Sequence, residues 1–448
     1  MLNPEEARGR ADDLVQAAKK AGADAADAIY LCDASTQVQM RLGELEDVER
    51  SEGEDIGLRV FVGNRSASVS SSDMNPEILS SLVGRAVDMA REAPEDPYAG
   101  LAPEDRLHKG PFKELEMDDG REMEPRQMRE IALRTEDAAR AVEGVSNSEG
   151  AGVSASRTIV ALATSGGFSG SYSASGYGCS ASVLAGSGSE MESDYAYRMT
   201  RHLEDLEAAE DIGKRAGEYA VARLGPVSFK SGAMPVLFDP RVSSSIIGHL
   251  LGAISGSAIA RKTSFLLESL DTMVFDSSIN IIDCPHRLRG LRSKPFDGEG
   301  LPTAKSKPIE NGRLTSWLME SASAKQLGLA PTGHASRGVG GAPGVSPTNV
   351  HMCAGDQSPK ALMADIKNGV YITNLIGMGV NGVTGDYSRG AGGFLIQDGE
   401  ITSPISEITI AGNLKDMFSS MIAADDLEFH ESTNAPTLRF EGMTVAGG

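Results

Sequence analysis

The sequence of 448 residues has no long hydrophobic run. The longest candidate, Ile246–Ala260, is interrupted by His249, three glycines and two serines. A helix that spans a membrane needs about 20 predominantly apolar residues, so we expect no transmembrane segment. The first ten residues carry two acids, two bases and no apolar stretch, so a secretory signal peptide is not expected either.

Cysteine is scarce. The four cysteines, Cys32, Cys179, Cys284 and Cys353, lie far apart and form no CxxC pair. In a chain without an export signal, this pattern is typical of free thiols in a reducing compartment. We therefore expect a cytoplasmic protein without disulfide bonds.

Basic residues are too few to balance the acids. The chain has 42 Lys and Arg against 63 Asp and Glu, a net charge of −21, of which −18 falls in residues 1–225 and −3 in residues 226–448. An acidic half would repel a phosphate backbone, and no basic patch with interleaved aromatic residues occurs, so nucleic-acid binding is not expected. The difference between the halves suggests a boundary near Gly225-Pro226.

The residues that are present indicate an α+β fold. Glycine is abundant, at 51 residues, and aromatic residues make up only 5%, which favours turns and closely packed strands. Residues 1–110 are predicted to form an N-terminal α/β subdomain, with a helix at Pro4–Ala21, short strands and a second helix after Asn75.

Two further regions follow. Residues 111–225 are predicted to form a central subdomain with flanking helices and long antiparallel strands on either side of a Ser165-Gly166-Gly167 turn. Residues 226–448 are predicted to form a β-rich C-terminal domain that contains a glycine-interrupted helix over Ser243–Ile259.

Several catalytic motifs are missing. No two of the seven histidines lie within ten residues, which excludes a helix-borne HExxH zinc motif, and the GxSxG, SxxK and phosphate-loop motifs are absent. One GxGxxG occurs at Gly377–Gly382, but a turn and a strand are expected after it. Dinucleotide binding requires a helix at that point, so we interpret the motif as a glycine-rich connection between strands.

One other arrangement could hold a metal ion. Cys284 with His286, and His351 with Cys353, each place two possible ligands on one face of a strand. A closed zinc site would form if the two segments were adjacent, but buried cysteines and ordinary histidines are the favoured interpretation. His249, among apolar helix residues, is likewise interpreted first as a structural histidine.

Four longer segments carry a family resemblance. They are IGLRVFVGNRSASVSSSD (Ile56–Asp73), GHLLGAISGSAIARKTSFL (Gly248–Leu266), FDGEGLPT (Phe296–Thr303) and GVYITNLIGMGVNGVTGDYSRGAGGFLIQDGEITSPISEITIAGNLKDMF (Gly369–Phe418). With them the chain resembles the TldD/PmbA family, also called the modulator of DNA gyrase family, over essentially its whole length. The resemblance is closest to the PmbA (TldE) type, which lacks the HExxxH motif.

The resemblance implies a PmbA/TldD-like fold and a cytoplasmic zinc metalloprotease that is assembled from two homologous subunits. In that family the TldD-type subunit carries HExxxH and a further cysteine ligand. The dimer encloses a cavity that admits unfolded peptides and binds their backbone by β-pairing.

The chain departs from the family at the metal-binding motif. The resemblance places Gly248 at the first metal histidine, His249 at the catalytic glutamate and Ala253 at the second metal histidine, with His430 near the cysteine position. Glycine and alanine side chains offer no lone pair, so we expect no catalytic residue and no metal in this chain. Zinc is expected in the TldD-type partner.

These observations predict a non-catalytic subunit of a TldD–TldE-type heterodimer, which closes the cavity and helps to bind unfolded peptide. Six residues of the C-terminal segments are candidates for peptide binding, through strand edges and polar side chains: Tyr371, Thr373, Asn374, Asp386, Ser388 and Arg389. Roles in turns and packing are the alternative for these residues.

Two other functions stay open at this point. One is a stand-alone, homodimeric peptide-binding or scaffold protein without protease activity. The other is a metal enzyme that uses Cys284, His286, His351 and Cys353.

Overall fold

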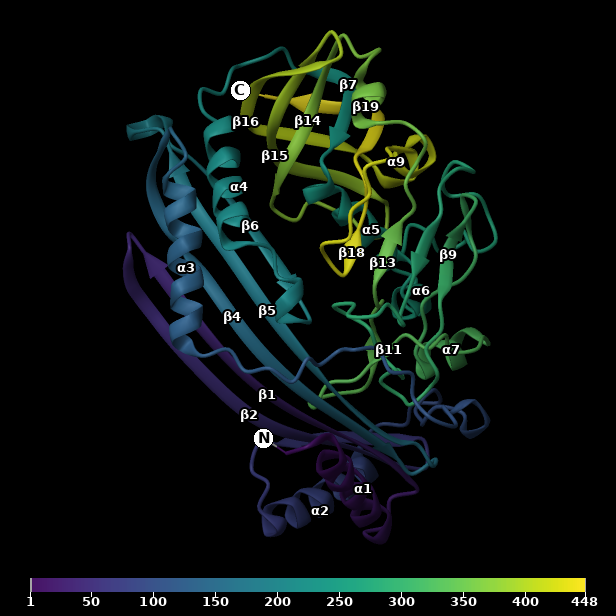
Figure 1. The fold of residues 1–448 in the computed structure, drawn as a ribbon. Helices are drawn as coiled ribbons and strands as arrows, with labels where there is room; N and C mark the ends of the chain where they lie inside the picture. Colours follow the sequence, from purple (N-terminus) through teal and green to yellow (C-terminus); the bar gives the residue numbers. More distant parts are fainter. Residues whose placement is uncertain (1, 448) are drawn as a thin grey trace.

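The N-terminal half is built on one long, curved antiparallel sheet, as the computed structural model of residues 2–447 shows (Figure 1). Its strands are β1 Ala25–Arg41, β2 Glu44–Val62, β3 Arg65–Ser71, β4 Val145–Thr164, β5 Ser169–Ala185 and β6 Glu192–Thr200. They lie in the order β3-β2-β1-β4-β5-β6, so residues on both sides of position 110 contribute to a single sheet.

Four helices cover one face of this sheet: α1 Pro4–Lys20, α2 Pro76–Glu92, α3 Pro125–Arg140 and α4 Ala209–Ala222. Side chains alternate between the two faces of a strand. Tyr30 of β1 therefore packs with α1 and α2, and Met40, on the same face, packs with α3 and α4. The helices predicted in this half are confirmed, as is the turn at Ser165–Gly167 between β4 and β5.

The first two strands differ from the sequence prediction. β1 and β2 are continuous strands of 17 and 19 residues where short strands were expected, and β2 begins at Glu44 within a charged stretch. Leu42 and Gly43 make the turn between them with positive φ values of 54° and 81°. β3 pairs with β2 only over Ile56–Val62, so the charged half of β2 has β1 as its only neighbour among the described residues.

The other face of the sheet carries the C-terminal domain. Ile29 and Leu31 of β1 point to this face and pack with Phe168 and with Phe296 of the C-terminal half. The rings of Phe168 and Phe296 meet edge to face, with centroids 4.9 Å apart. This small apolar cluster joins the two halves of the chain.

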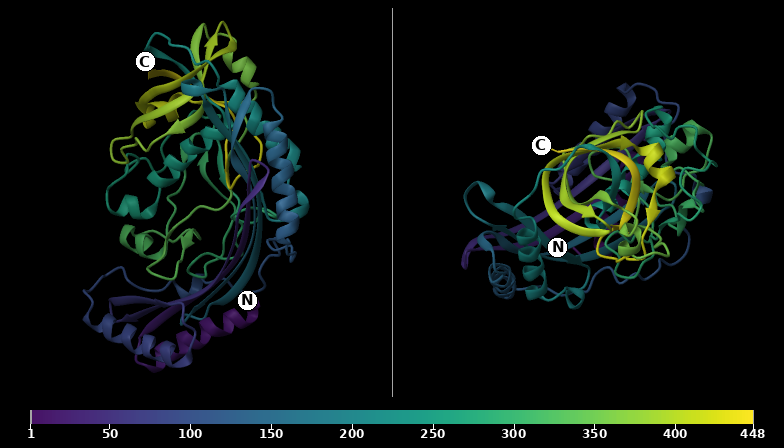
Figure 2. Two further views of the ribbon diagram at one scale, coloured as in Figure 1. Left: turned by 90° about the vertical axis from the view of Figure 1, so that its left-hand side faces the viewer. Right: turned by 90° about the horizontal axis from the view of Figure 1, so that it is seen from above.

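A closed barrel forms the far end of the C-terminal domain. Its strands are β7 Gly232–Phe238, β14 Asn368–Ile376, β15 Asp386–Gln397, β16 Glu400–Asn413 and β19 Leu438–Ala446, with β17 Ile422–Ala423 attached. They follow the order β16-β15-β14-β7-β19, and β16 also pairs with β19, which closes the ring seen from above in Figure 2. This β-rich domain confirms the predicted fold class.

Shorter elements link the barrel to the first sheet. A second sheet has the order β10-β9-β8-β13-β18, and a two-stranded ribbon pairs β11 with β12. Their bounds are β8 Ile281–Asp283, β9 Ser306–Glu310, β10 Arg313–Leu314, β11 Ala335–Ser336, β12 Gly344–Val345, β13 Val350–Met352 and β18 Thr433–Asn434. The remaining helices are α5 Pro240–Ala253, α6 Gly256–Ala260, α7 Ser321–Leu327, α8 Pro359–Met363 and α9 Leu414–Ser420, with single 3-10 turns η1 Glu104–Arg106, η2 Gly188–Glu190 and η3 Leu203–Asp205.

The helix expected over Ser243–Ile259 is broken in two. Leu318 pairs with the chain at the break, where its oxygen accepts a hydrogen bond from Gly256 N and its nitrogen donates to Ile254 O, at 2.7 and 3.0 Å. This neighbouring segment takes hydrogen bonds that a continuous helix would have made internally.

A buried ion-pair triad holds the C-terminal domain against the sheet. Asp27 of β1 accepts hydrogen bonds from Arg59 Nε of β2 at 2.7 Å and from Arg337 Nε of the loop between β11 and β12 at 3.1 Å. The side chains of Asp27 and Arg337 are 3% and 0% exposed. Beside them, Gly57 lies so close to this loop that a Cβ atom would sit 2.3 Å from Val339 O.

Two buried acids of the FDGEGLPT segment, Asp297 and Glu299, accept hydrogen bonds that hold this part of the chain in place. Asp297 accepts backbone hydrogen bonds from Glu299, Leu301 and Ala335, and Glu299 accepts two from Ser321. Burial, with a smaller contribution from Asp297, raises the pKa of Glu299 to about 7. The two acids therefore fix a buried turn of the chain.

Replacing Asp27 leaves two arginines buried without their carboxylate. We expect Asp27→Asn to lower the free energy of unfolding by about 3 kcal/mol, because the desolvation cost of the two buried arginines is then no longer compensated by a carboxylate. Urea unfolding followed by circular dichroism measures this change. Asp33→Asn is the matched control, since Asp33 is exposed on the same strand and face; it should cost less than about 1 kcal/mol, and an equal loss in both variants would contradict the role of the triad.

The raised pKa of Glu299 predicts a pH dependence. Between pH 4.5 and about 7 the folded state keeps this proton while the unfolded state loses it, so the contribution of Glu299 to stability falls as the pH rises. A shift of this size corresponds to roughly 3 kcal/mol. Urea unfolding at several pH values should show this decline in the wild-type chain and in the exposed control Glu268→Gln, and a smaller decline in Glu299→Gln. Identical pH profiles for Glu299→Gln and the wild type would rule the effect out.

Candidate functional site

The residues at the predicted motif positions lie on α5. Asp239 caps this helix by accepting a hydrogen bond from Arg241 N at 2.9 Å, and Ile246, Ile247 and Leu250 bury its apolar face. The opposite side is open to solvent at Gly248 and half-buried at His249. The helix thus presents one imidazole among glycines.

This donor set does not fit a zinc ion. Zinc sites use three or four nitrogen, sulfur or oxygen ligands, whereas Gly248 and Ala253 have no ligating side-chain atom. Within residues 2–447, no group of three or more His, Cys, Asp or Glu side chains is arranged to hold a metal ion. No catalytic step through zinc can be assigned to this chain on that geometry.

His249 lines a cavity of about 260 Å³ that we call the glycine pocket. The other lining residues are Gly248, Gly252, Ala253, Thr263, Phe265, Met378, Gly379, Val380, Gly382 and Arg389. The predicted site residue Arg389, on β15, therefore faces the same space as the motif helix. The GxGxxG segment, which joins β14 to β15 with no helix after it, forms the opposite wall.

The polar groups of the glycine pocket have few partners. Burial, and secondarily the charge of Arg389, lowers the pKa of His249, which keeps the imidazole neutral. His249 Nε2 and Arg389 Nε are both buried and lack a hydrogen-bond partner among the described residues. The His249 and Tyr387 rings meet edge to face, with centroids 5.9 Å apart.

A second cavity, of about 420 Å³, lies between the sheet edge at β6 and the start of α5, and we call it the β6 cavity. Tyr371 lies here and donates a hydrogen bond to Asp239 at 2.8 Å; burial raises the pKa of Tyr371. His430 also lines this cavity and hydrogen-bonds to Arg198, so the structure does not bring His430 together with His249 in one pocket.

The β6 cavity contains residues that the sequence analysis missed. Tyr195 and Tyr197 stack on one face of β6, with centroids 6.0 Å apart. Arg241 pairs with Asp194 at 2.5 Å and lies 4.1 Å from the centroid of the Tyr219 ring. The alternating tyrosines of Asp194–Tyr197 were the available sequence signal.

The remaining candidate residues are distributed around the barrel. Thr373 is buried on β14, and Asn374 Oδ1 is buried there without a described partner. β14 pairs with β7 on one side and β15 on the other, so its backbone at Tyr371 and Ile372 is already hydrogen-bonded. The strand can therefore offer side chains but no free edge at these positions.

The start of β15 holds the other two candidates. Asp386 accepts hydrogen bonds from Thr384 Oγ1 at 2.7 Å and Asn413 Nδ2 at 3.1 Å. Ser388 is exposed, and its backbone nitrogen donates to Gly379 O at 2.7 Å. These contacts fix the loop that walls the glycine pocket.

The cysteine and histidine segments are adjacent, because β8 pairs with β13. The pairing is antiparallel and places Cys284 beside Asn349 but Cys353 beside Asn280, at opposite ends. His286 is engaged by Lys113 and Thr303, and His351 by Arg287. The four side chains do not converge on one point.

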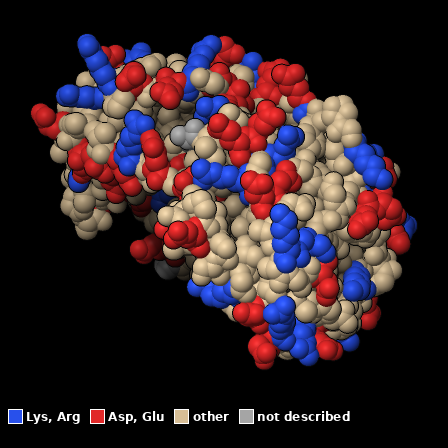
Figure 3. Space-filling model, turned by 90° about the horizontal axis from the view of Figure 1, so that it is seen from below, with Lys and Arg blue, Asp and Glu red and all other residues tan. Residues whose placement is uncertain are grey.

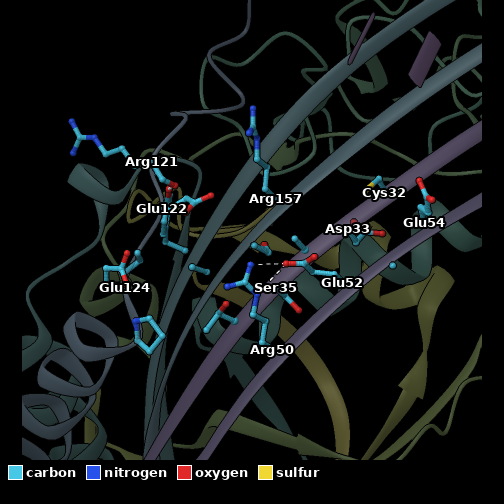
Figure 4. Close-up of a pocket in the computed structure, with 18 of the residues that line it drawn as sticks. Cys32, Asp33, Ser35, Arg50, Glu52, Glu54, Arg121, Glu122, Glu124 and Arg157 are labelled. Carbon is cyan, nitrogen blue, oxygen red and sulfur yellow. Dashed lines mark hydrogen bonds and ion pairs between the residues drawn. The ribbon is translucent and has the colours of Figure 1, made fainter. Parts of the chain in front are cut away.

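A further cavity, of about 660 Å³, lies on the helix-covered face of the sheet between α1 and α3 (Figure 4). Four of its charged side chains form two ion pairs: Arg50 with Glu52 at 2.6 Å, and Arg10 with Glu54 at 3.4 Å. Arg157, labelled in the same view, pairs with Asp118 at 2.8 Å. The acids Asp33, Glu122 and Glu124 also line this groove, so acids slightly outnumber bases there.

The surface seen from below mixes charges of both signs (Figure 3). Lysines and arginines are interspersed there with aspartates and glutamates, without a broad basic patch on that face. Across the described part of the chain, no helix has the length and apolar character required to cross a bilayer.

Comparisons with known proteins agree with the sequence resemblance. Profiles of the PmbA/TldA metallopeptidase family match three consecutive segments: domain 1 over residues 26–90, the central domain over residues 118–224 and the C-terminal domain over residues 231–447. The metalloprotease PmbA of Escherichia coli O157:H7 is 36% identical over 412 residues, which cover 92% of this chain and 89% of that protein. A PmbA homologue of Haemophilus influenzae is 36% identical over 97% of this chain and 94% of its own length.

Solved structures share the whole architecture. A Bacteroides thetaiotaomicron protein assigned as a candidate modulator of DNA gyrase superposes with a TM-score of 0.91 at 27% identity, covering 100% of both chains. TldE of Thermococcus kodakarensis superposes with a TM-score of 0.87 over 98% of this chain and 100% of that chain; at 21% identity it supports the fold alone. On the three domain matches and the full-length relatives, the chain belongs to the PmbA/TldD family of metallopeptidases.

Proposed function

We propose that this chain is the metal-free, non-catalytic subunit of a cytoplasmic, heterodimeric zinc metalloprotease. Its partner would be a homologous TldD-type subunit that carries the zinc, and the substrate would be an unfolded peptide. This chain would close the cavity of the complex and help to hold the peptide.

The observation that supports this proposal is the donor set on α5. The motif positions Gly248, His249 and Ala253 supply one neutral imidazole, and His430 lines a different cavity. Hydrolysis at zinc requires ligands that hold the ion and a base that activates water. A chain with this donor set depends on another subunit for both.

The two cavities support a role in peptide binding. The β6 cavity combines Tyr195, Tyr197 and Tyr371 with charged side chains, and tyrosines offer large contact areas with one polar end. The glycine pocket leaves the surface of α5 uncovered at Gly248 and Gly252. Both features are suited to holding a ligand without cleaving it.

Mixing the subunits tests the proposal. The pure chain is expected to contain no zinc and to cleave no unfolded peptide, because it lacks the ligands. With a TldD-type subunit it should form a heterodimer with about one zinc ion and cleave peptide in a chelator-sensitive way. Elemental analysis, light scattering and a fluorogenic peptide assay measure these quantities.

The control addresses the other possible ligands in this chain. A Cys284→Ser, His351→Ala variant removes one donor from each paired strand and should leave the zinc content of the heterodimer unchanged. Stoichiometric zinc and cleavage by the pure chain would overturn the proposal. Failure to associate with the partner, together with a peptide-binding homodimer, would replace it with the stand-alone scaffold function.

A further inference from the structure

The glycine pocket has a fixed shape. Phe265 N donates to Gly382 O at 2.8 Å and Asn381 N to Asp386 O at 2.9 Å, which ties the loop between β14 and β15 to its surroundings. A Cβ atom at Gly379 would sit 1.6 Å from Ser388 O, so this loop lies directly on β15. The wall opposite α5 is therefore pre-formed.

The floor of the pocket is bare helix surface. A Cβ atom at Gly248 or Gly252 would meet nothing within 4 Å, so a ligand can approach the α5 backbone closely at both positions. The volume of about 260 Å³ is below the roughly 300–1,000 Å³ of sites for drug-sized ligands. It suits one terminal residue or one side chain rather than a long segment.

Arg389 gives the pocket an unbalanced positive charge. Among the described residues, its guanidinium takes part in no ion pair, and no acidic residue lines the pocket. His249 beside it is held neutral, so it does not compensate the charge. Arg389 is the one charged side chain among the residues that line the pocket.

The repulsion of an anion by the C-terminal end of α5 is reduced here by hydrogen bonds to its carbonyl groups. The last carbonyl groups of the helix accept hydrogen bonds from within the chain: Leu250 O from Ile254 N, Gly252 O from Ser255 N and Ala253 O from Ser264 Oγ. Each of these three oxygens therefore already has a donor. Arg389 Nε, which can only donate, is buried and lacks an acceptor among the described residues.

We propose that the glycine pocket binds the carboxylate of a peptide, with Arg389 as its charge partner and the His249 imidazole alongside. A guanidinium fork matches a carboxylate in charge and geometry, and a bound carboxylate supplies the acceptor that Arg389 Nε lacks among the described residues. This inference rests on the proposed peptide-binding function and specifies the group that is recognised. The carboxylate comes from a peptide C-terminus or from an acidic side chain.

Matched peptides test the inference on the full chain, since all the walls of the pocket belong to it. Fluorescence anisotropy would compare a labelled short peptide as its C-terminal acid and as its C-terminal amide, together with an amide whose last residue is Asp. We expect the wild-type chain to bind a carboxylate-bearing peptide about tenfold to a hundredfold more tightly than the plain amide. Preference for the acid assigns the C-terminus, and preference for the Asp amide assigns a side chain.

Variants connect the preference to Arg389. Arg389→Gln should reduce the affinity for the carboxylate peptide to that of the amide, and Arg389→Lys should retain part of the preference because it keeps the charge without the fork. Arg261→Gln, an exposed arginine that does not line the pocket, makes the same charge change and should preserve it.

Equal binding of acid, Asp amide and plain amide by the wild-type chain overturns the inference without relying on any variant. An unchanged preference in Arg389→Gln also overturns it. Both results would leave the zinc and cleavage measurements on the mixed subunits to decide the proposed function separately.

Discussion

The arrangement of the two halves depends on the buried carboxylate of Asp27. It lies between Arg59 of the sheet and Arg337 of a C-terminal loop, so one side chain links residues more than three hundred positions apart. Gly57 allows the loop that carries Arg337 to approach the sheet closely, because any side chain at this position would collide with Val339 O. Charge pairing and close approach together fix the C-terminal domain on the concave face, and this placement creates the β6 cavity between the sheet edge and α5.

Local patterns in the sequence were sufficient for the helices and for much of the β-structure. Apolar spacing located α1 to α4, and the glycine turn located the β4–β5 hairpin. The patterns failed where long-range contacts decide the structure. Glu44–Asp55 has few apolar residues and pairs as a strand because β1 lies beside it, and the break at Ile254 arises from hydrogen bonds with the distant Leu318.

The candidate site was predictable only in part. The resemblance identified the α5 positions and Arg389, and the structure brings Arg389 and His249 to one pocket. The structure also places Tyr371 in a separate cavity. No spacing in the sequence indicates that Tyr371 and Arg389 line different cavities, because this depends on which strands flank β14. Asp194, Tyr195 and Arg241 were missed for a similar reason: their significance comes from the meeting of β6 with α5.

The charged half of β2 has a consequence for the behaviour of the protein in solution. Because β3 covers only Ile56–Val62, the outer edge of Glu44–Asp55 has no partner strand within residues 2–447, at the margin of the sheet. Such margins are templates on which other chains can add strands, and dense like charge discourages that addition. The acidic residues that make this strand hard to predict from the sequence therefore also oppose self-association. Replacing them with neutral residues would favour aggregation and leave the fold intact.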